Sequence, residues 1–201
     1  MDLVSVLDIM SASTLQISPP DSTAPELSAE RFELDKFLGA WHVVWSTLPL
    51  WKDKKDVCIT YSAMAEDSTG RPRLDDLVEY RKQSASSDSI PSTVKGIDVL
   101  DNSHNGATFN WRGKGWLKIA SSHWQFLGYD QESSEPQWAV TFFSKTLFTP
   151  AGLDIYMRQP LPEAGNAGKA QLEKIVAAII ASPDKTIAQL AKDGGFVVGL
   201  P

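Results

Sequence analysis

Apolar and polar side chains alternate along much of the chain between residues 41 and 158. In the run Trp-His-Val-Val-Trp, a period of two puts Trp41, Val43 and Trp45 on one face of an extended strand. Short alternating segments separated by turn residues are typical of antiparallel sheets that bury one face. The segments that we predict as strands are 41–45, 57–63, 74–82, 94–100, 123–129, 137–145 and 153–158.

Residues 108–120 are compatible with two interpretations. They form either one long strand bent at glycine, or two strands joined by a tight connection at Gly113-Lys114-Gly115. In 74–82 the face that carries Glu79 and Arg81 is expected to be solvated, which leaves Val78 and Tyr80 inside.

The C-terminal part changes to a helical period. Apolar residues at Leu172, Ile175, Val176, Ile179 and Ile180 predict a helix over 167–181 that ends before Pro183. A further helical segment over 186–192 closes at Gly194-Gly195, and residues 196–198 form an apolar tail. The Ser-, Thr- and Pro-rich start predicts a flexible leader over residues 1–27, followed by one domain over residues 28–201.

Two sequence features at opposite ends of the strand region resemble those of the lipocalin family. Gly39-Ala40-Trp41 opens the first strand after residues 32–36, and Arg158 ends the last strand before a proline. The sequence Gly128-Tyr129-Asp130 partly matches the acidic-aromatic turn of the family. The resemblance is closest to bacterial-type lipocalins. It implies an all-β fold, an eight-stranded antiparallel up-and-down β-barrel with a flanking C-terminal α-helix. It also implies that Arg158 lies across Trp41 at the closed end and that residues 47–55 form a lid over the mouth.

Composition limits the compartment and the partners. A length of 201 residues suits a single domain with a full core. The net charge is −6 and the only basic cluster is at Lys52, Lys54 and Lys55, which argues against nucleic acid. No apolar run approaches the length of a membrane span. The single Cys58 excludes an internal disulfide and the N-terminus lacks a positive region, so we expect a cytoplasmic protein.

We expect no metal and no cofactor. His42, His104 and His123 share no ligand spacing, so ordinary surface histidines are favoured over a zinc site or a haem held by one histidine. The chain has no Gly-x-Ser-x-Gly motif, and the default for Cys58 within a strand is a buried structural thiol.

Seven tryptophans are compatible with a barrel core filled by bulky rings and with the walls of an apolar ligand pocket. In a small barrel the two interpretations overlap, because the core surrounds the pocket. If Arg158 lies at the barrel floor, Tyr156 and Asp154 share its face and approach the mouth, where His123 also sits. These three are the candidate catalytic groups; the plainer interpretation is that tyrosines bond backbone or water and Asp154 faces solvent. The candidate ligand-binding residues are Trp45, Trp51, Tyr61, Tyr80, Trp111, Trp116, Trp124, Phe126, Trp138 and Phe142.

The favoured function is binding of a small hydrophobic molecule of fatty acid, polyketide or terpenoid type. The alternative is a biosynthetic enzyme that uses the same aromatic-lined interior of the barrel. It would be an isomerase, cyclase or dehydratase that acts by shape and general acid–base catalysis. A protein-interaction module is least favoured, because the chain shows no dedicated partner surface. The sequence does not indicate an oligomeric state.

Overall fold

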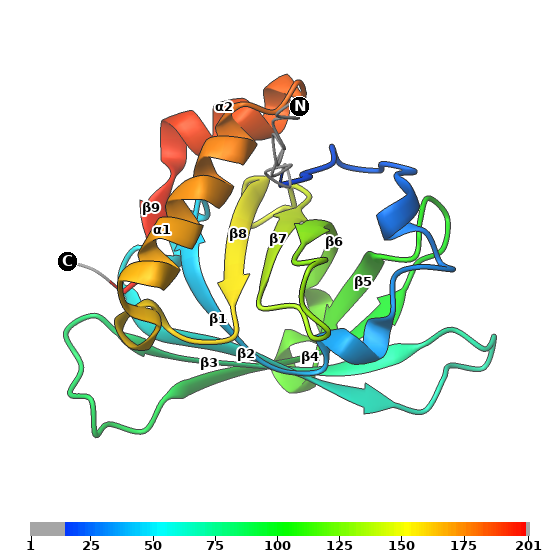
Figure 1. Cartoon of the computed structure of the whole chain (residues 1–201). Coiled ribbons are helices and arrows are strands. Elements are labelled where there is room, and N and C mark those ends of the chain that lie inside the picture. The colour runs from blue at the N-terminus through cyan, green and yellow to red at the C-terminus, as the bar shows by residue number, and fades with distance from the viewer. Residues whose placement is uncertain (1–14, 200–201) are drawn as a thin grey trace, which may run out of the picture.

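Eight antiparallel strands form a closed barrel in the computed structural model, which describes residues 15–199 except the side chain of Trp116 (Figure 1). Neighbouring strands follow chain order, and β1 closes the ring by pairing with both β2 and β8. A short ninth strand extends this sheet beside β1. The strands are β1 Gly39–Ser46, β2 Lys54–Met64, β3 Arg73–Lys82, β4 Ser92–Leu100, β5 Thr108–Gly113, β6 Ser121–Tyr129, β7 Trp138–Phe143, β8 Gly152–Met157 and β9 Phe196–Val197. The predicted up-and-down barrel is therefore confirmed.

The segment after β5 differs from both interpretations of residues 108–120. A 3-10 helix, η4 (Gly115–Ile119), separates β5 from β6, so the strands are two but their connection is not tight. Gly115 has a φ of +61°, a conformation that glycine adopts without strain. The loop therefore changes the chain direction at the barrel mouth instead of continuing the wall.

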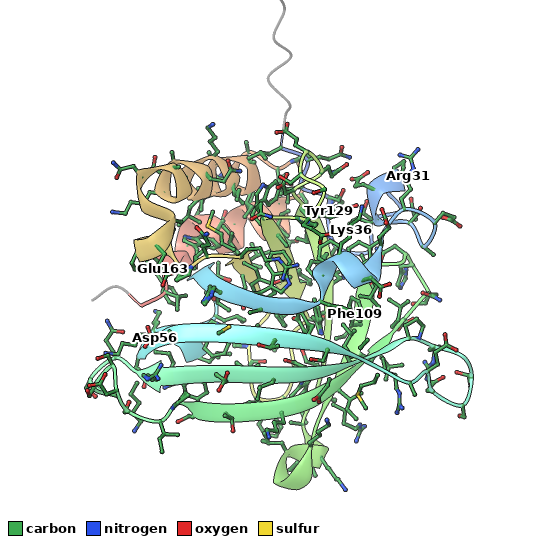
Figure 2. The ribbon with its side chains drawn as sticks, turned by 60° about the horizontal axis from the view of Figure 1, so that its bottom comes forward. Arg31, Lys36, Asp56, Phe109, Tyr129 and Glu163 are labelled. Carbon is green, nitrogen blue, oxygen red and sulfur yellow. The ribbon has the colours of Figure 1, made fainter. Side chains whose placement is uncertain are left out.

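The closed end of the barrel is built on Trp41. Its fully buried indole stacks on Phe37 of η2 (Leu34–Phe37) and donates from Nε1 to the Phe37 carbonyl at 2.8 Å. The Arg158 guanidinium carbon lies 3.7 Å from the centroid of the Trp41 ring, as expected from the sequence. Gly39 precedes this contact with a φ of +87°, which explains why glycine opens the strand. In Figure 2 this end of the barrel is marked by Lys36 and Tyr129.

The guanidinium of Arg158 also ties the closed end to the chain around it. Its nitrogens donate to four backbone carbonyls at 2.7–3.3 Å, those of Lys36, Leu38, Ala40 and Pro136. Each of these carbonyls belongs to the turn before β1, to β1 itself or to the β6–β7 loop. The Arg158 side chain therefore connects the end of β8 to residues 36–40 and to the β6–β7 loop, which are distant from one another in the sequence.

A β-bulge in β1 overturns the predicted orientation of Trp45. The register against β8 shifts between Val43 and Trp45, so that Val43 faces Tyr156 while Trp45 faces Ile155. Trp41 and Val43 lie in the barrel interior, but Trp45 lies outside and packs against Gly195. The extra residue reverses the alternation, and strict period-two counting cannot anticipate it.

Two helices cover the outer face of this wall (Figure 1). They are α1 (Leu161–Ile180), interrupted by a non-helical Gly165, and α2 (Lys185–Gly194), capped by Asp184. The predicted helix starts six residues too late, but its apolar positions Leu172, Ile175 and Ile179 are buried as expected. They pack against outward-facing residues of β7 and β8, which include Trp138, Val140, Phe142 and Ile155. Trp138 and Phe142 are therefore not cavity residues, contrary to our prediction.

Part of the predicted flexible leader packs on the barrel. The Ser18 N–H donates to the Leu127 carbonyl at 2.8 Å, and the Asp21 N–H donates to Gln125 Oε1 at 2.7 Å. Leu27, in η1 (Pro25–Leu27), is fully buried in the core at the closed end. Residues 15–27 thus extend the domain beyond its predicted start at 28, whereas residues 1–14 lie outside the described part.

Replacing Arg158 tests the closed end. Arg158→Ala should lower the free energy of unfolding by about 2 kcal/mol, because it removes charge-assisted hydrogen bonds as well as the contact with the indole. Urea denaturation measures the change, and Arg158→Lys should recover only part of it because an ammonium lacks the planar fork. Equal stability of Arg158→Ala and the wild type would contradict this account.

Candidate ligand cavity in the barrel

A cavity of about 270 Å³ occupies the barrel above the filled closed end. Its walls come from β2, β3, β4, β5, β6, β7 and β8, and its mouth from the segment after β1 and the β7–β8 loop. We call it the barrel cavity. Its lining residues are Leu48, Leu50, Trp51, Ile59, Tyr61, Asp76, Val78, Val94, Trp111, Ala120, Ser121, Ser122, Trp124, Phe143, Thr146, Phe148, Thr149, Asp154 and Tyr156.

Six of the candidate residues named from the sequence line this cavity. They are Trp51, Tyr61, Trp111, Trp124, Asp154 and Tyr156. Two more candidates belong to the same core without lining the cavity: Phe126 packs below Trp124, and Tyr80 packs edge-on against Trp51. Trp45, Trp138 and Phe142 lie on the outer face of the barrel, and the side chain of Trp116 lies outside the described part.

Asp154 is fully buried on β8 and meets two donors. Ser46 Oγ donates to its Oδ1 at 2.5 Å, and Trp51 Nε1 donates to its Oδ2 at 3.2 Å. The Ser46 side chain lies opposite Asp154 because of the bulge in β1. Burial raises the pKa of Asp154 to about 7, and the two donors act in the opposite direction. The Asp154 carboxyl is therefore close to half-protonated near neutral pH. Its hydrogen bond from Trp51 Nε1 also holds the Trp51 side chain at the mouth of the cavity.

Asp76 and Asp98 are two interior carboxyls that the sequence analysis did not select. Burial raises the pKa of Asp76 to about 7, and the Trp111 indole opposes this shift. Burial, with Asp76 nearby, raises the pKa of Asp98 well above its usual range. Trp124 Nε1 donates to Asp98 Oδ1 at 2.7 Å. Asp76 shares the face of Val78 and Tyr80, so alternation gave a signal for its position, but a buried acid was not expected there.

Tyr156 and Tyr61 lie between these carboxyls. Tyr156 is fully buried, its hydroxyl lies close to the hydroxyls of Thr141 and Tyr61, and burial raises its pKa well above the usual value. Tyr61 stacks on Trp124 with the ring centroids 5.7 Å apart. Tyr61 pairs in register with Asp76, which places a phenol directly beside a carboxyl. The interior thus combines aromatic walls with neutral or weakly acidic groups.

His123 does not face the barrel cavity. It lies on the outer face of β6, with Nδ1 at 3.5 Å from Ser144 Oγ and Nε2 at 3.9 Å from Asp101 Oδ2. It lines an exterior groove of about 950 Å³ together with the exposed Leu147 and Phe148. The prediction that His123 joins Asp154 and Tyr156 is therefore wrong, because Trp124, its neighbour on the strand, takes the inward position.

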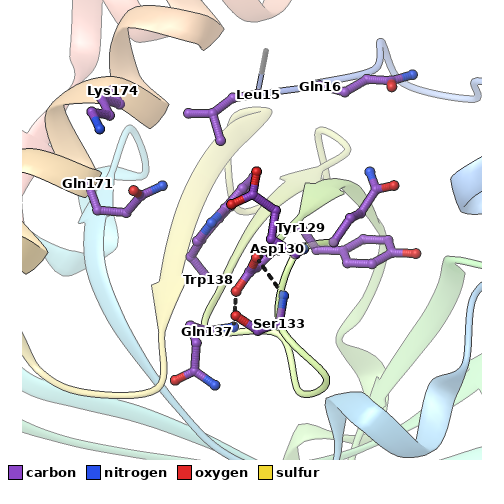
Figure 3. Close-up of a pocket in the computed structure, with 11 residues that line it drawn as sticks. Leu15, Gln16, Tyr129, Asp130, Ser133, Gln137, Trp138, Gln171 and Lys174 are labelled. Carbon is purple, nitrogen blue, oxygen red and sulfur yellow. Dashed lines mark hydrogen bonds between the residues drawn. The ribbon is translucent and has the colours of Figure 1, made fainter. Parts of the chain in front are cut away.

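Another hollow lies between the N-terminal segment, the β6–β7 turn and α1 (Figure 3). It measures about 460 Å³, and Asp130 lies on its floor. The Asp130 carboxylate accepts hydrogen bonds from the backbone N–H groups of Glu132, Ser133 and Gln137, with N–O distances of 3.1–3.4 Å. These bonds assign Asp130 to the turn, and no buried polar side-chain atom without a hydrogen-bond partner lines this hollow among its described residues.

Residues 15–199 show neither a metal-binding cluster nor a membrane-spanning helix. No group of three or more His, Cys, Asp or Glu side chains there is placed to hold a metal ion. None of the helices in that range is both long and apolar enough to cross a bilayer.

Similarity to known proteins is found at the level of structure. No family model and no curated protein sequence matches the chain. Apocrustacyanin C2 superposes with a TM-score of 0.56 at 14% identity, over 92% of this chain and 91% of that chain. Lobster apocrustacyanin A1 gives a TM-score of 0.54 at 14% identity over the same shares of the two chains. The chain has a lipocalin fold. At this level of identity the likeness establishes the lipocalin fold alone, so function must be argued from the cavity.

The buried carboxyls predict an unusual pH dependence. Because the pKa of Asp76 and of Asp154 is raised to about 7 in the folded state and is about 3.9 in the unfolded chain, the folded state binds more protons between these values. Their contribution to stability is fully present below pH about 4 and is lost as the pH rises through about 7.

Urea denaturation of the wild type and Asp76→Asn across this pH range provides the measurement. The variant should lose less stability with rising pH, by roughly 1 kcal/mol per pH unit over the steepest part. Glu79→Gln, which changes an outward-facing carboxyl of the same strand, should follow the wild type. Parallel profiles for all three proteins would show that Asp76 is ionised normally.

Proposed function

We propose that this protein binds one small, largely apolar molecule inside the barrel cavity. The observation that carries the proposal is a cavity of about 270 Å³ walled by Trp51, Tyr61, Trp111 and Trp124 in a barrel whose other end is filled. Ligand pockets are concave, mostly apolar and furnished with a few polar groups. The barrel cavity has this character, with Asp76, Asp154 and Tyr156 as its buried polar groups.

The volume restricts the ligand further. Pockets for drug-sized ligands begin at roughly 300 Å³, so the barrel cavity suits a compact molecule. Among the fatty acid, polyketide and terpenoid classes expected from the sequence, a short or compact terpenoid or polyketide fits without rearrangement of the walls. A long extended chain requires the mouth to open.

The mouth is closed in part by the segment that the sequence predicts as a lid. Leu48 is buried against Gly152, and Leu50 and Trp51 of η3 (Pro49–Trp51) line the cavity. The hydrogen bond from Trp51 to Asp154 joins this lid to the cavity wall. A ligand that reorganises Asp154 therefore acts on the lid at the same time.

A cavity-filling substitution tests the binding function. Val94→Phe adds a ring inside the barrel cavity, so the affinity for a compact neutral terpenoid such as camphor should fall about tenfold or more. Titration calorimetry measures the affinity. Val99→Phe, on the outward face of the same strand, should bind camphor as the wild type does. Undiminished binding to Val94→Phe, or no saturable binding of compact apolar molecules to the wild type, would refute the proposal.

A second candidate function is catalysis in the same cavity. The observation that favours it is Asp154, a buried carboxyl whose pKa is raised to about 7 and which shares the cavity with the buried Tyr156 hydroxyl. A general acid–base works best when its pKa lies near the working pH. An isomerase, cyclase or dehydratase needs such a group beside a substrate held in a reactive conformation.

Turnover of polyketide or terpenoid intermediates tests this candidate. Product should form faster than in a protein-free control, and Asp154→Asn should reduce the rate by about a hundredfold or more while binding is retained. Tyr156→Phe separates the contribution of the phenol. Saturable binding without conversion of any such intermediate leaves the binding function alone.

We also propose that the chain acts inside the cell, without nucleic acid as a partner. A single cysteine and a net charge of −6 support this. Cys58 is half-buried on β2, and burial raises the pKa of its thiol, as is typical of an unreactive structural cysteine. Comparison with further sequences tests the proposed resemblance to bacterial-type lipocalins. A measurement of the molecular mass in solution gives the oligomeric state.

A further inference from the structure

Three carboxyl groups are buried inside the barrel without a cationic partner. No Lys, Arg or His nitrogen among the described residues forms an ion pair with Asp76, Asp98 or Asp154. The nearest cation that acts on Asp76 is Lys114, which pairs with Asp75 on the outside of β3. Buried charges in proteins are normally paired, so an unpaired acidic interior requires a reason.

Asp76 is the carboxyl best placed to meet a ligand. It lines the barrel cavity, it is more than nine-tenths buried, and its Oδ1 has no hydrogen-bond partner among the described residues. Asp98 Oδ2, on the neighbouring strand β4, also has no hydrogen-bond partner among the described residues, but Asp98 does not line the cavity. Asp154 differs, because both of its oxygens already accept hydrogen bonds. Within residues 15–199, the two buried carboxyl oxygens without a hydrogen-bond partner, Asp76 Oδ1 and Asp98 Oδ2, therefore both lie on the wall formed by β3 and β4.

Indole rings surround this wall. The Trp111 ring lies directly over Gly96. A Cβ atom at position 96 would come within 1.9 Å of Trp111 Nε1, so only glycine leaves room for the ring at this point of β4. Gly96 pairs in register with Asp76, which puts the Trp111 ring beside that carboxyl. Trp124 binds Asp98 through its N–H. Aromatic faces next to carboxylates are the surroundings that stabilise an organic cation.

We infer that the ligand is a protonated amine, whose ammonium group binds Asp76 and whose apolar body packs between Trp111, Trp124 and Tyr61. This inference rests on the proposed binding function and names the chemical class of its ligand. A negatively charged head group is disfavoured by the three acids. A neutral alcohol can satisfy Asp76 Oδ1 by donating one hydrogen bond but gains no attraction from the charge.

Binding of an ammonium group must displace a proton. The pKa of Asp76 is about 7 in the empty cavity, and the cation stabilises the ionised form, so the carboxyl releases its proton to solvent as the amine binds. Affinity for an amine should therefore rise with pH through about 7 and level off above it. Affinity for a neutral molecule should not rise in this way.

The test compares three probes that share one apolar body: phenylbutylamine, phenylbutanol and phenylbutyrate. Titration calorimetry of the full chain at pH about 6 and about 8 gives their affinities and the protons released. At the higher pH we expect the amine to bind about tenfold or more tighter than the alcohol, and the acid to bind weakest. The amine alone should gain affinity with pH and release a proton.

Two variants locate the effect. Asp76→Asn should weaken amine binding about tenfold or more and abolish its pH dependence while alcohol binding is retained. Glu79→Gln, on the outward face of the same strand, should leave all three affinities unchanged. If Asp76→Asn fails to fold, the comparison of the three probes on the wild type still decides the matter.

The outcomes separate the two proposals. If the alcohol or the acid binds as tightly as the amine, or if amine binding is independent of pH, the inference is wrong and the binding function stands. If Asp76→Asn binds the amine as the wild type does, Asp76 is not the anchor and the inference fails. If none of the three probes binds, the proposed binding function fails and this inference with it.

Discussion

Strand β1 hydrogen-bonds to both β2 and β8, and this double pairing turns a sheet into a barrel that has an inside. The pairing to β8 includes one bulge, after Val43. Below the bulge, Trp41 and Val43 point inward and fill the closed end; above it, Ser46 points inward and Trp45 points out. Because Ser46 lies opposite Asp154, the bulge decides which groups reach the cavity and which reach the helices.

The interior is divided between stability and function. At the closed end, stacked rings and the Arg158 guanidinium exclude space and satisfy backbone carbonyls, which stabilises the fold. Toward the mouth, the same barrel buries Asp76, Asp98 and Asp154, which costs free energy as soon as they ionise. Carboxyls that are buried there without a cationic partner are easier to explain as part of a binding site than as a source of stability.

Much of the fold can be predicted from the sequence, because two strong signals coincide. Gly39, Trp41 and Arg158 mark both ends of the barrel chain, and alternation groups the residues of β2 and β3 into two faces without deciding which face points inward. The orientation of β7 is different: Trp138, Val140 and Phe142 form the more apolar face, yet they face the helices while Thr141 faces inward. When both faces of a strand are buried, periodicity cannot say which one lines the cavity.

The candidate site could be predicted only in part. Asp154 and Tyr156 lie four and two residues before Arg158, so period-two alternation puts them on its face, and the structure places both in the cavity. Asp76 carries the same alternation signal, but burial of an unpaired acid is too rare to be assumed from sequence. The prediction for His123 was wrong because it used only the position of the residue near the start of a strand. Whether a side chain faces the cavity depends on the face of the strand, and on β6 the inward face belongs to Trp124.

The most direct test of the central claim, that the barrel cavity is the ligand site, is a ¹⁵N–¹H spectrum of the tryptophan indoles during titration with a compact apolar ligand, assigned by single Trp→Phe variants. The structure predicts that the resonances of Trp51, Trp111 and Trp124 shift together and saturably. It predicts that those of Trp41, Trp45 and Trp138, which lie at the closed end or under the helices, remain in place. Shifts confined to the second group would place the ligand outside the cavity and contradict the account.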